Sequence, residues 1–136
     1  MIYGLFQFYH DELNSWRRTI AFHKEELHES IRQISVLMGQ QVISSENEKQ
    51  SASLTDQFVV QEQQFDHVAN QIIAQKQRLE RTGFFQGKRL EPSVSQAQDS
   101  IRLKIRNAER KFARTKYSCT LYLSSFLRDG SLAVQN

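Results

Sequence analysis

The amino-acid sequence predicts an all-α protein, an antiparallel up-down-up bundle of three long amphipathic helices with coiled-coil-like packing. Three observations support this prediction. Long stretches of the 136-residue chain contain neither Gly nor Pro, and within them apolar residues recur every three or four positions. The segments between these stretches are short, which favours antiparallel neighbours. We expect a single domain over residues 1–136, with helices at about 10–43, 53–82 and 93–128.

The first predicted helix begins near residues 9–11, because the acidic side chain of Asp11 suits the positive end of a helix dipole. Its apolar residues fall on one side of a helical wheel. They are Leu13, Trp16, Ile20, Leu27, Ile31, Ile34 and Met38. Two ends fit the pattern: the helix stops at Gly39, or it continues to about Ser44 and frays through the polar residues 45–51.

The second predicted helix ends before Gly83, a residue suited to the left-handed conformation that follows many helices. Its apolar stripe consists of Leu54, Phe58, Phe65, Val68, Ala69, Ile72 and Leu79. After it we expect a loop in which Phe84 and Phe85 cover the end of the bundle.

The third predicted helix begins after Pro92, where Ser93 and Gln96 have the spacing of a capping box. Its stripe comprises Val94, Ala97, Ile101, Ile105, Ala108, Phe112, Cys119 and Phe126. Residues 117–126 also fit the two-residue alternation of a strand. We favour a continued helix, because nothing interrupts the helical pattern before Gly130.

Composition places the chain among soluble, cytoplasmic proteins. The single Cys119 cannot form an internal disulfide, and no apolar run reaches the roughly 18 to 20 residues of a membrane span. The apolar start of the chain lacks the basic region of a signal peptide, so we interpret it as mature protein. Phosphate-binding glycine loops are absent and Cys119 falls on an apolar stripe, so we expect no enzyme and no cofactor.

The motif most suggestive of metal binding is Glu25-x-x-His28, because Glu-x-x-His supplies ligands to carboxylate-bridged metal pairs in helical bundles. On a helical wheel the two side chains point about 140° and about 80° away from the apolar stripe, so they do not face the core together. His67 lies opposite its own stripe. His23, nearer the core edge, is expected to pair locally with Glu26. We therefore expect no metal site.

A cationic surface is the second candidate. The net charge is +3, and its surplus lies in the last third of the chain. Arg102, Arg106, Arg110 and Arg114 recur every four residues and form one oblique ridge opposite the apolar stripe. This ridge predicts binding to nucleic acid or another polyanion, such as an acidic protein. The alternative is a solvated face that pairs with acidic side chains such as Glu25 or Glu29.

Apolar side chains outside the three stripes are the third candidate. Phe22 and Val36 point away from the predicted core and lie two heptads apart, and Val60 is similarly outward. Together with Tyr3, Phe6, Phe8 and Tyr9 they predict an interaction surface. The leading hypothesis is therefore a non-enzymatic bundle that self-associates as a homo-oligomer or binds another helical protein. Polyanion binding through the arginine ridge is the alternative.

Overall fold

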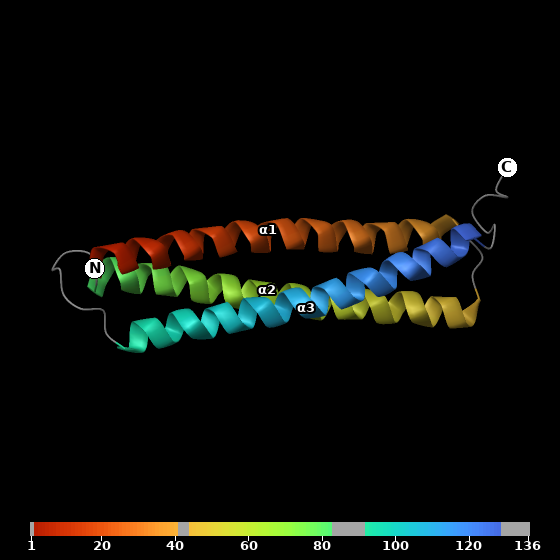
Figure 1. The fold of residues 1–136 in the computed structure, drawn as a ribbon. Helices are drawn as coiled ribbons and strands as arrows, with labels where there is room; N and C mark the ends of the chain where they lie inside the picture. Colours follow the sequence, from red (N-terminus) through yellow and green to blue (C-terminus); the bar gives the residue numbers. More distant parts are fainter. Residues whose placement is uncertain (1, 41–43, 83–91, 129–136) are drawn as a thin grey trace.

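The computed structural model describes residues 2–40, 44–82 and 92–128, and it confirms the predicted fold class (Figure 1). Three helices run up, down and up along one long axis: α1 (Ile2–Gln40), α2 (Ser45–Thr82) and α3 (Pro92–Arg128). The described residues contain no strand. The three helices share one hydrophobic cluster along their whole length.

The start of α1 differs from the prediction, because the aromatic N-terminal segment is helical from Ile2. Phe6 and Tyr9 are buried and continue the spacing of Leu13 toward the N-terminus. The Tyr9 hydroxyl also lies 3.1 Å from the hydroxyl of Ser95 on α3. Tertiary packing of these aromatic rings therefore extends the helix by two turns, which the acidic start signal did not indicate.

The start of α2 also differs, because residues 45–51 are helical and do not fray. Ser44 caps this helix: its hydroxyl accepts a hydrogen bond from the backbone N–H of Asn47 at 3.1 Å. Ser51 is fully buried and lies within hydrogen-bond distance of the Tyr122 hydroxyl on α3. A cap at one end and a buried contact at the other hold this polar turn in the helix.

The bounds of α3 match the prediction to within a residue, and residues 117–126 are helix, as favoured. Cys119, Tyr122 and Phe126 are buried at intervals of three and four. The predicted capping role of Ser93 is wrong, since Pro92 already belongs to the helix. Proline suits the first helical position because its missing N–H would have no intrahelical partner there. The expected packing of Phe84 and Phe85 lies outside the described residues.

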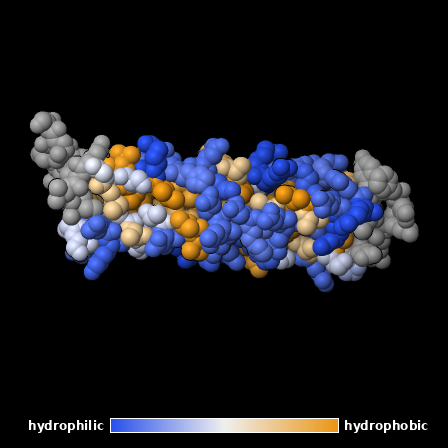
Figure 2. All heavy atoms as spheres, turned by 180° about the vertical axis from the view of Figure 1, so that it is seen from behind, coloured by the Kyte–Doolittle hydropathy of each residue, from blue (hydrophilic) through white to orange (hydrophobic). Residues whose placement is uncertain are grey.

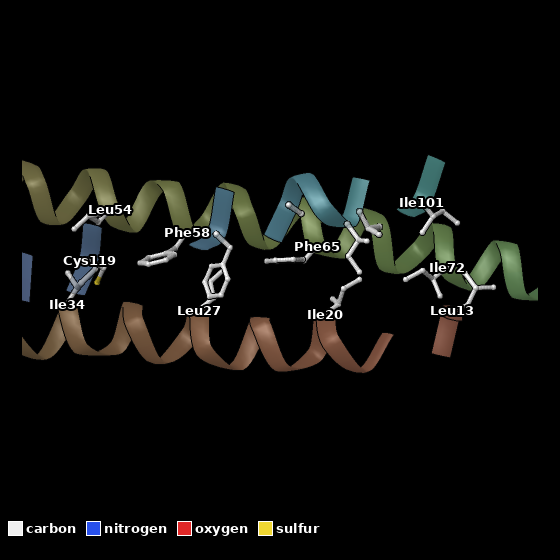
Figure 3. Packing of buried hydrophobic residues seen from close by; sticks show 14 of the residues in the cluster. Leu13, Ile20, Leu27, Ile34, Leu54, Phe58, Phe65, Ile72, Ile101 and Cys119 are labelled. Atoms are coloured by element: carbon white, nitrogen blue, oxygen red, sulfur yellow. The ribbon is translucent and has the colours of Figure 1, made fainter. Parts of the chain in front are cut away.

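Buried positions alternate in three-residue and four-residue steps in α2 and α3, and α1 keeps the same spacing with the half-buried Trp16 and His23 at two of its positions. In α2 this heptad spacing runs from Ser51 to Leu79 without a break. The side chains point into the space between the helices, and Ile34, Leu54 and Cys119 bring together one residue from each helix (Figure 3). The core is therefore a stack of layers along the bundle axis.

Polar residues occupy some core positions, and the best connected group centres on Gln98, which is fully buried. Its amide donates to the backbone carbonyl of Tyr9 at 3.2 Å and to the carboxylate of Glu12 at 3.0 Å. Its oxygen accepts from the buried amide of Gln75 on α2 at 3.0 Å. One side chain thus joins all three helices, and polar groups at core positions specify the register of such bundles.

Candidate functional surfaces

The four arginines of the predicted ridge have different surroundings in the structure. Arg102 makes two hydrogen bonds to the carboxylate of Glu12 on α1, at 2.6 and 3.0 Å, and a third to Asp99 at 2.6 Å. Its guanidinium also lies 5.6 Å from the ring centre of Trp16. The hydrogen bonds that Arg102 donates to the Glu12 carboxylate raise the pKa of Arg102. This arginine belongs to the polar layer around Gln98, and only the other three remain candidates for binding.

Arg106, Arg110 and Arg114 are exposed, and within the described parts of the chain they form no ion pair. Arg114 lines a groove of about 810 Å³ between α2 and α3, together with Lys49 and Lys111. The amide oxygen of Gln61, a buried residue of the same groove, has no hydrogen-bond partner among the residues that the structure describes. The three arginines thus reach from the outer side of α3 to a groove that carries further positive charge.

The acidic residues of α1 do not neutralise these arginines. Glu29 pairs with Arg32 on its own helix at 2.5 Å, and Glu25 is exposed without an ion pair to any described residue. The carboxylates of α1 that reach α3 are Glu12, bound to Arg102, and Glu26, bound to Lys116. Neither Glu25 nor Glu29 therefore pairs with the arginine ridge, in contrast to the alternative prediction.

His23 lies between two carboxylates at the edge of the core. Its predicted partner, Glu26, is the more distant of the two. Its Nε2 atom is 2.8 Å from Glu109 of α3, whereas its Nδ1 atom is 3.6 Å from Glu26. The ring stacks on Phe65, with 5.5 Å between ring centres. The hydrogen bond from Lys116 lowers the pKa of Glu26. These contacts join α1 to α3 through the Nε2 atom of His23, while its buried Nδ1 atom has no hydrogen-bond partner among the described residues.

The motif considered for metal binding is dispersed. Glu25 is exposed, while His28 hydrogen bonds to Glu62 of α2. His67 is exposed on α2 and lines a second part of the groove between α2 and α3. Across the described residues, no three His, Cys, Asp or Glu side chains lie close enough together to hold a metal ion. Cys119 is buried, and burial raises the pKa of its thiol, so the reactive thiolate is disfavoured.

The predicted apolar surface is retained on α1 with one correction. Phe8, Phe22 and Val36 are 56%, 57% and 43% exposed. Phe6 is only 4% exposed, so its assignment to the interface is wrong: the N-terminal helix turns it, with Tyr9, into the core. The side chain of Tyr3 lies outside what the structure describes. The remaining three residues recur every 14 positions, about 21 Å apart along the helix.

Sequence reasoning missed further exposed apolar residues. On α3 these are Leu103, Tyr117 and Leu121, and on α2 Val59 and Ile73 accompany the predicted Val60. These residues occupy heptad positions outside the buried ones. Extending the core spacing along each helix would therefore have predicted their exposure. One long side of the bundle shows apolar spots separated by hydrophilic side chains (Figure 2). Such separated spots suit a helix-to-helix contact better than a broad flat interface.

Comparisons with known protein families, with curated proteins and with solved structures found no match. Within the described residues, no helix is long and apolar enough to cross a membrane.

Proposed function

We propose that the protein is a non-enzymatic helical bundle that acts through protein contacts and associates with itself. The observation that supports this proposal most directly is the exposure of Phe8, Phe22 and Val36 along one side of α1. Each side chain leaves apolar area in water, and covering such area contributes about 25 cal/mol per Å². Evenly spaced exposed residues of this kind are typical of a surface that another helix covers.

Two further features belong to the same proposal. The three-and-four spacing of buried and half-buried core residues supports coiled-coil packing of the three helices, and the same packing mode suits a fourth helix from a partner. A cytoplasmic location fits a chain whose one cysteine, Cys119, is buried as a free thiol.

Replacing Phe22 by Glu is expected to weaken self-association at least tenfold and to leave helix content unchanged, because a carboxylate in the contact loses apolar burial and must be desolvated. Light scattering across a concentration series measures the association, and circular dichroism the helix content. Leu103→Glu is the matched control, since Leu103 is equally exposed but lies on α3. A chain that stays monomeric at all concentrations would refute self-association.

A second candidate function, polyanion binding through Arg106, Arg110 and Arg114, is favoured by a specific asymmetry. Every ion pair that joins two helices among the described residues has one partner on α1. The groove between α2 and α3 is lined by Lys49, Lys111 and Arg114 against one acidic residue, Asp56, and none of these cations forms an ion pair with a described residue. Phosphates of a nucleic acid would supply the missing negative charge.

The double variant Arg106→Glu/Arg110→Glu is expected to weaken binding to single-stranded or double-stranded nucleic acid strongly. Two lost phosphate contacts would reduce the slope of log affinity against log salt by about two. Fluorescence anisotropy of a labelled oligonucleotide at several salt concentrations measures both effects. Arg17→Glu/Arg81→Glu makes the same change in net charge elsewhere, and equal losses in the two variants would argue against a defined surface.

A further inference from the structure

The outward side of α1 carries a second heptad pattern, which we call the outer seam. Its members are all exposed and follow one another in alternating steps of three and four residues. They are Phe8, Asp11, Ser15, Arg18, Phe22, Glu25, Glu29, Arg32 and Val36. Because the buried positions of α1 keep the same repeat from Phe6 to Leu37, this seam stays opposite the core along the helix. In Figure 1, α1 runs along one long edge of the bundle.

The apolar members of the outer seam and four of its charged members are arranged about nearly the same point. Phe8 and Val36 lie 14 residues on either side of Phe22. The charged row Asp11, Arg18, Glu25 and Arg32 alternates in sign at seven-residue steps, and its midpoint falls between residues 21 and 22. Reversing the direction of the helix about this region therefore brings each charge of this row to within one residue of an opposite charge and each apolar residue opposite another apolar residue, while Glu29 comes opposite Ser15.

From this symmetry we infer that the partner is a second copy of the chain, bound antiparallel along the outer seam of α1 with a two-fold axis at Phe22. The inference rests on the proposed self-association and specifies its geometry. Phe22 faces its counterpart, and Phe8 faces Val36 of the second copy. Asp11 faces Arg32 of the second copy, and Arg18 faces Glu25. Such a contact is isologous, so it closes as a dimer.

Other arrangements of the same surface satisfy only part of the pattern. A parallel pair in register places each charge of the row opposite an identical charge. A parallel pair shifted by seven residues matches the charges, but it places Phe22 opposite Glu29 and also leaves an open, non-closing contact. Only the antiparallel pair matches both rows, because the centres of the two rows lie within half a residue of each other.

The other exposed helix face is a poor competitor for self-pairing. The outward positions of α3 include Leu103, Tyr117 and Leu121, but Arg110 and Arg114 lie among them, and the exposed acidic residue Asp99 of α3 already pairs with Arg102. Two copies of this face would bring like charges together, which costs free energy at close range. By contrast, Arg18 and Glu25 of α1 are exposed and have no ion pair among the described residues, so both are available to a partner.

Cross-linking distinguishes the arrangements without removing any apolar contact. Ser15 and Glu29 belong to the seam and are expected to face each other across the antiparallel dimer. An equimolar mixture of Ser15→Cys and Glu29→Cys is expected to form a covalent dimer with a short thiol-specific reagent, and neither variant alone is expected to do so. Cys119 does not interfere, because its side chain is 2% exposed. A parallel, in-register dimer would instead cross-link Ser15→Cys to itself.

A charge exchange provides the second test. Arg18→Glu is expected to weaken the dimer roughly tenfold, because it creates two repulsive pairs in a symmetric contact. Arg18→Glu/Glu25→Arg is expected to restore affinity. Arg17→Glu, a neighbouring exposed residue outside the seam, is the control and is expected to change affinity less than twofold.

The outcomes separate this inference from the proposed function on which it rests. A dimer by light scattering that cross-links only in the mixture, and that the charge exchange restores, supports both. A dimer in which Ser15→Cys cross-links to itself, or in which no variant cross-links, retains self-association and overturns the antiparallel seam. A chain that remains monomeric while fully helical overturns both.

Discussion

Phe65→Ala is expected to lower the free energy of unfolding by about 3–5 kcal/mol, the usual cost of truncating a fully buried aromatic side chain. Phe65 is completely buried in α2. Its ring packs edge-on against Phe112 of α3, with 5.9 Å between ring centres, and it stacks on His23 of α1. Truncation would leave a cavity that touches all three helices. The surrounding rings cannot close such a cavity without moving a helix.

Urea unfolding followed by circular dichroism measures this loss. Phe22→Ala is the matched control, because the same side chain is removed from a position that is 57% exposed. At a protein concentration where the chain is monomeric, the control is expected to change stability by no more than about 0.5 kcal/mol. Equal losses in the two variants would contradict the placement of Phe65 in the core and Phe22 on the surface.

Gln98→Leu is expected to lower the free energy of unfolding by about 1–3 kcal/mol, although it replaces a polar side chain by an apolar one of similar size. The reason is that Gln98 supplies hydrogen bonds to three groups at once. The carbonyl of Tyr9 and the carboxylate of Glu12 lose a donor, and the amide of Gln75 loses an acceptor. Buried polar groups without partners cost more than the hydrogen bond itself contributes.

The double variant Gln75→Leu/Gln98→Leu tests the same polar layer by removing both glutamines. It is expected to recover part of the stability lost in Gln98→Leu, because an apolar pair leaves fewer polar groups unsatisfied. Helix alignment is expected to become less specific, since a polar layer that joins three helices penalises shifted registers. Double-mutant analysis of urea unfolding gives the coupling, and broadened amide resonances would report the loss of alignment. Strictly additive losses would mean that the two glutamines act independently.

The sequence predicts the place of a surface residue correctly when that place depends only on the residue's own helix, and it fails when the place depends on another helix. Phe22 and Val36 were placed on the surface correctly, because helical periodicity within one segment determines which side they occupy. Phe6 was misplaced because the helix was expected to begin after it. Arg102 was assigned to a binding ridge by spacing alone, whereas its actual role depends on a carboxylate from another helix.

By itself the sequence determined that this protein forms three long helices, and which face of each is buried, because the spacing of apolar residues along a helix is a local property. Only the tertiary structure decided the partners of the polar core residues. Arg102 and Glu12 are 90 positions apart, and no periodicity relates them. Their meeting requires the register in which α1 and α3 pack, and the polar layer at Gln98 holds that register by hydrogen bonds to both neighbouring helices.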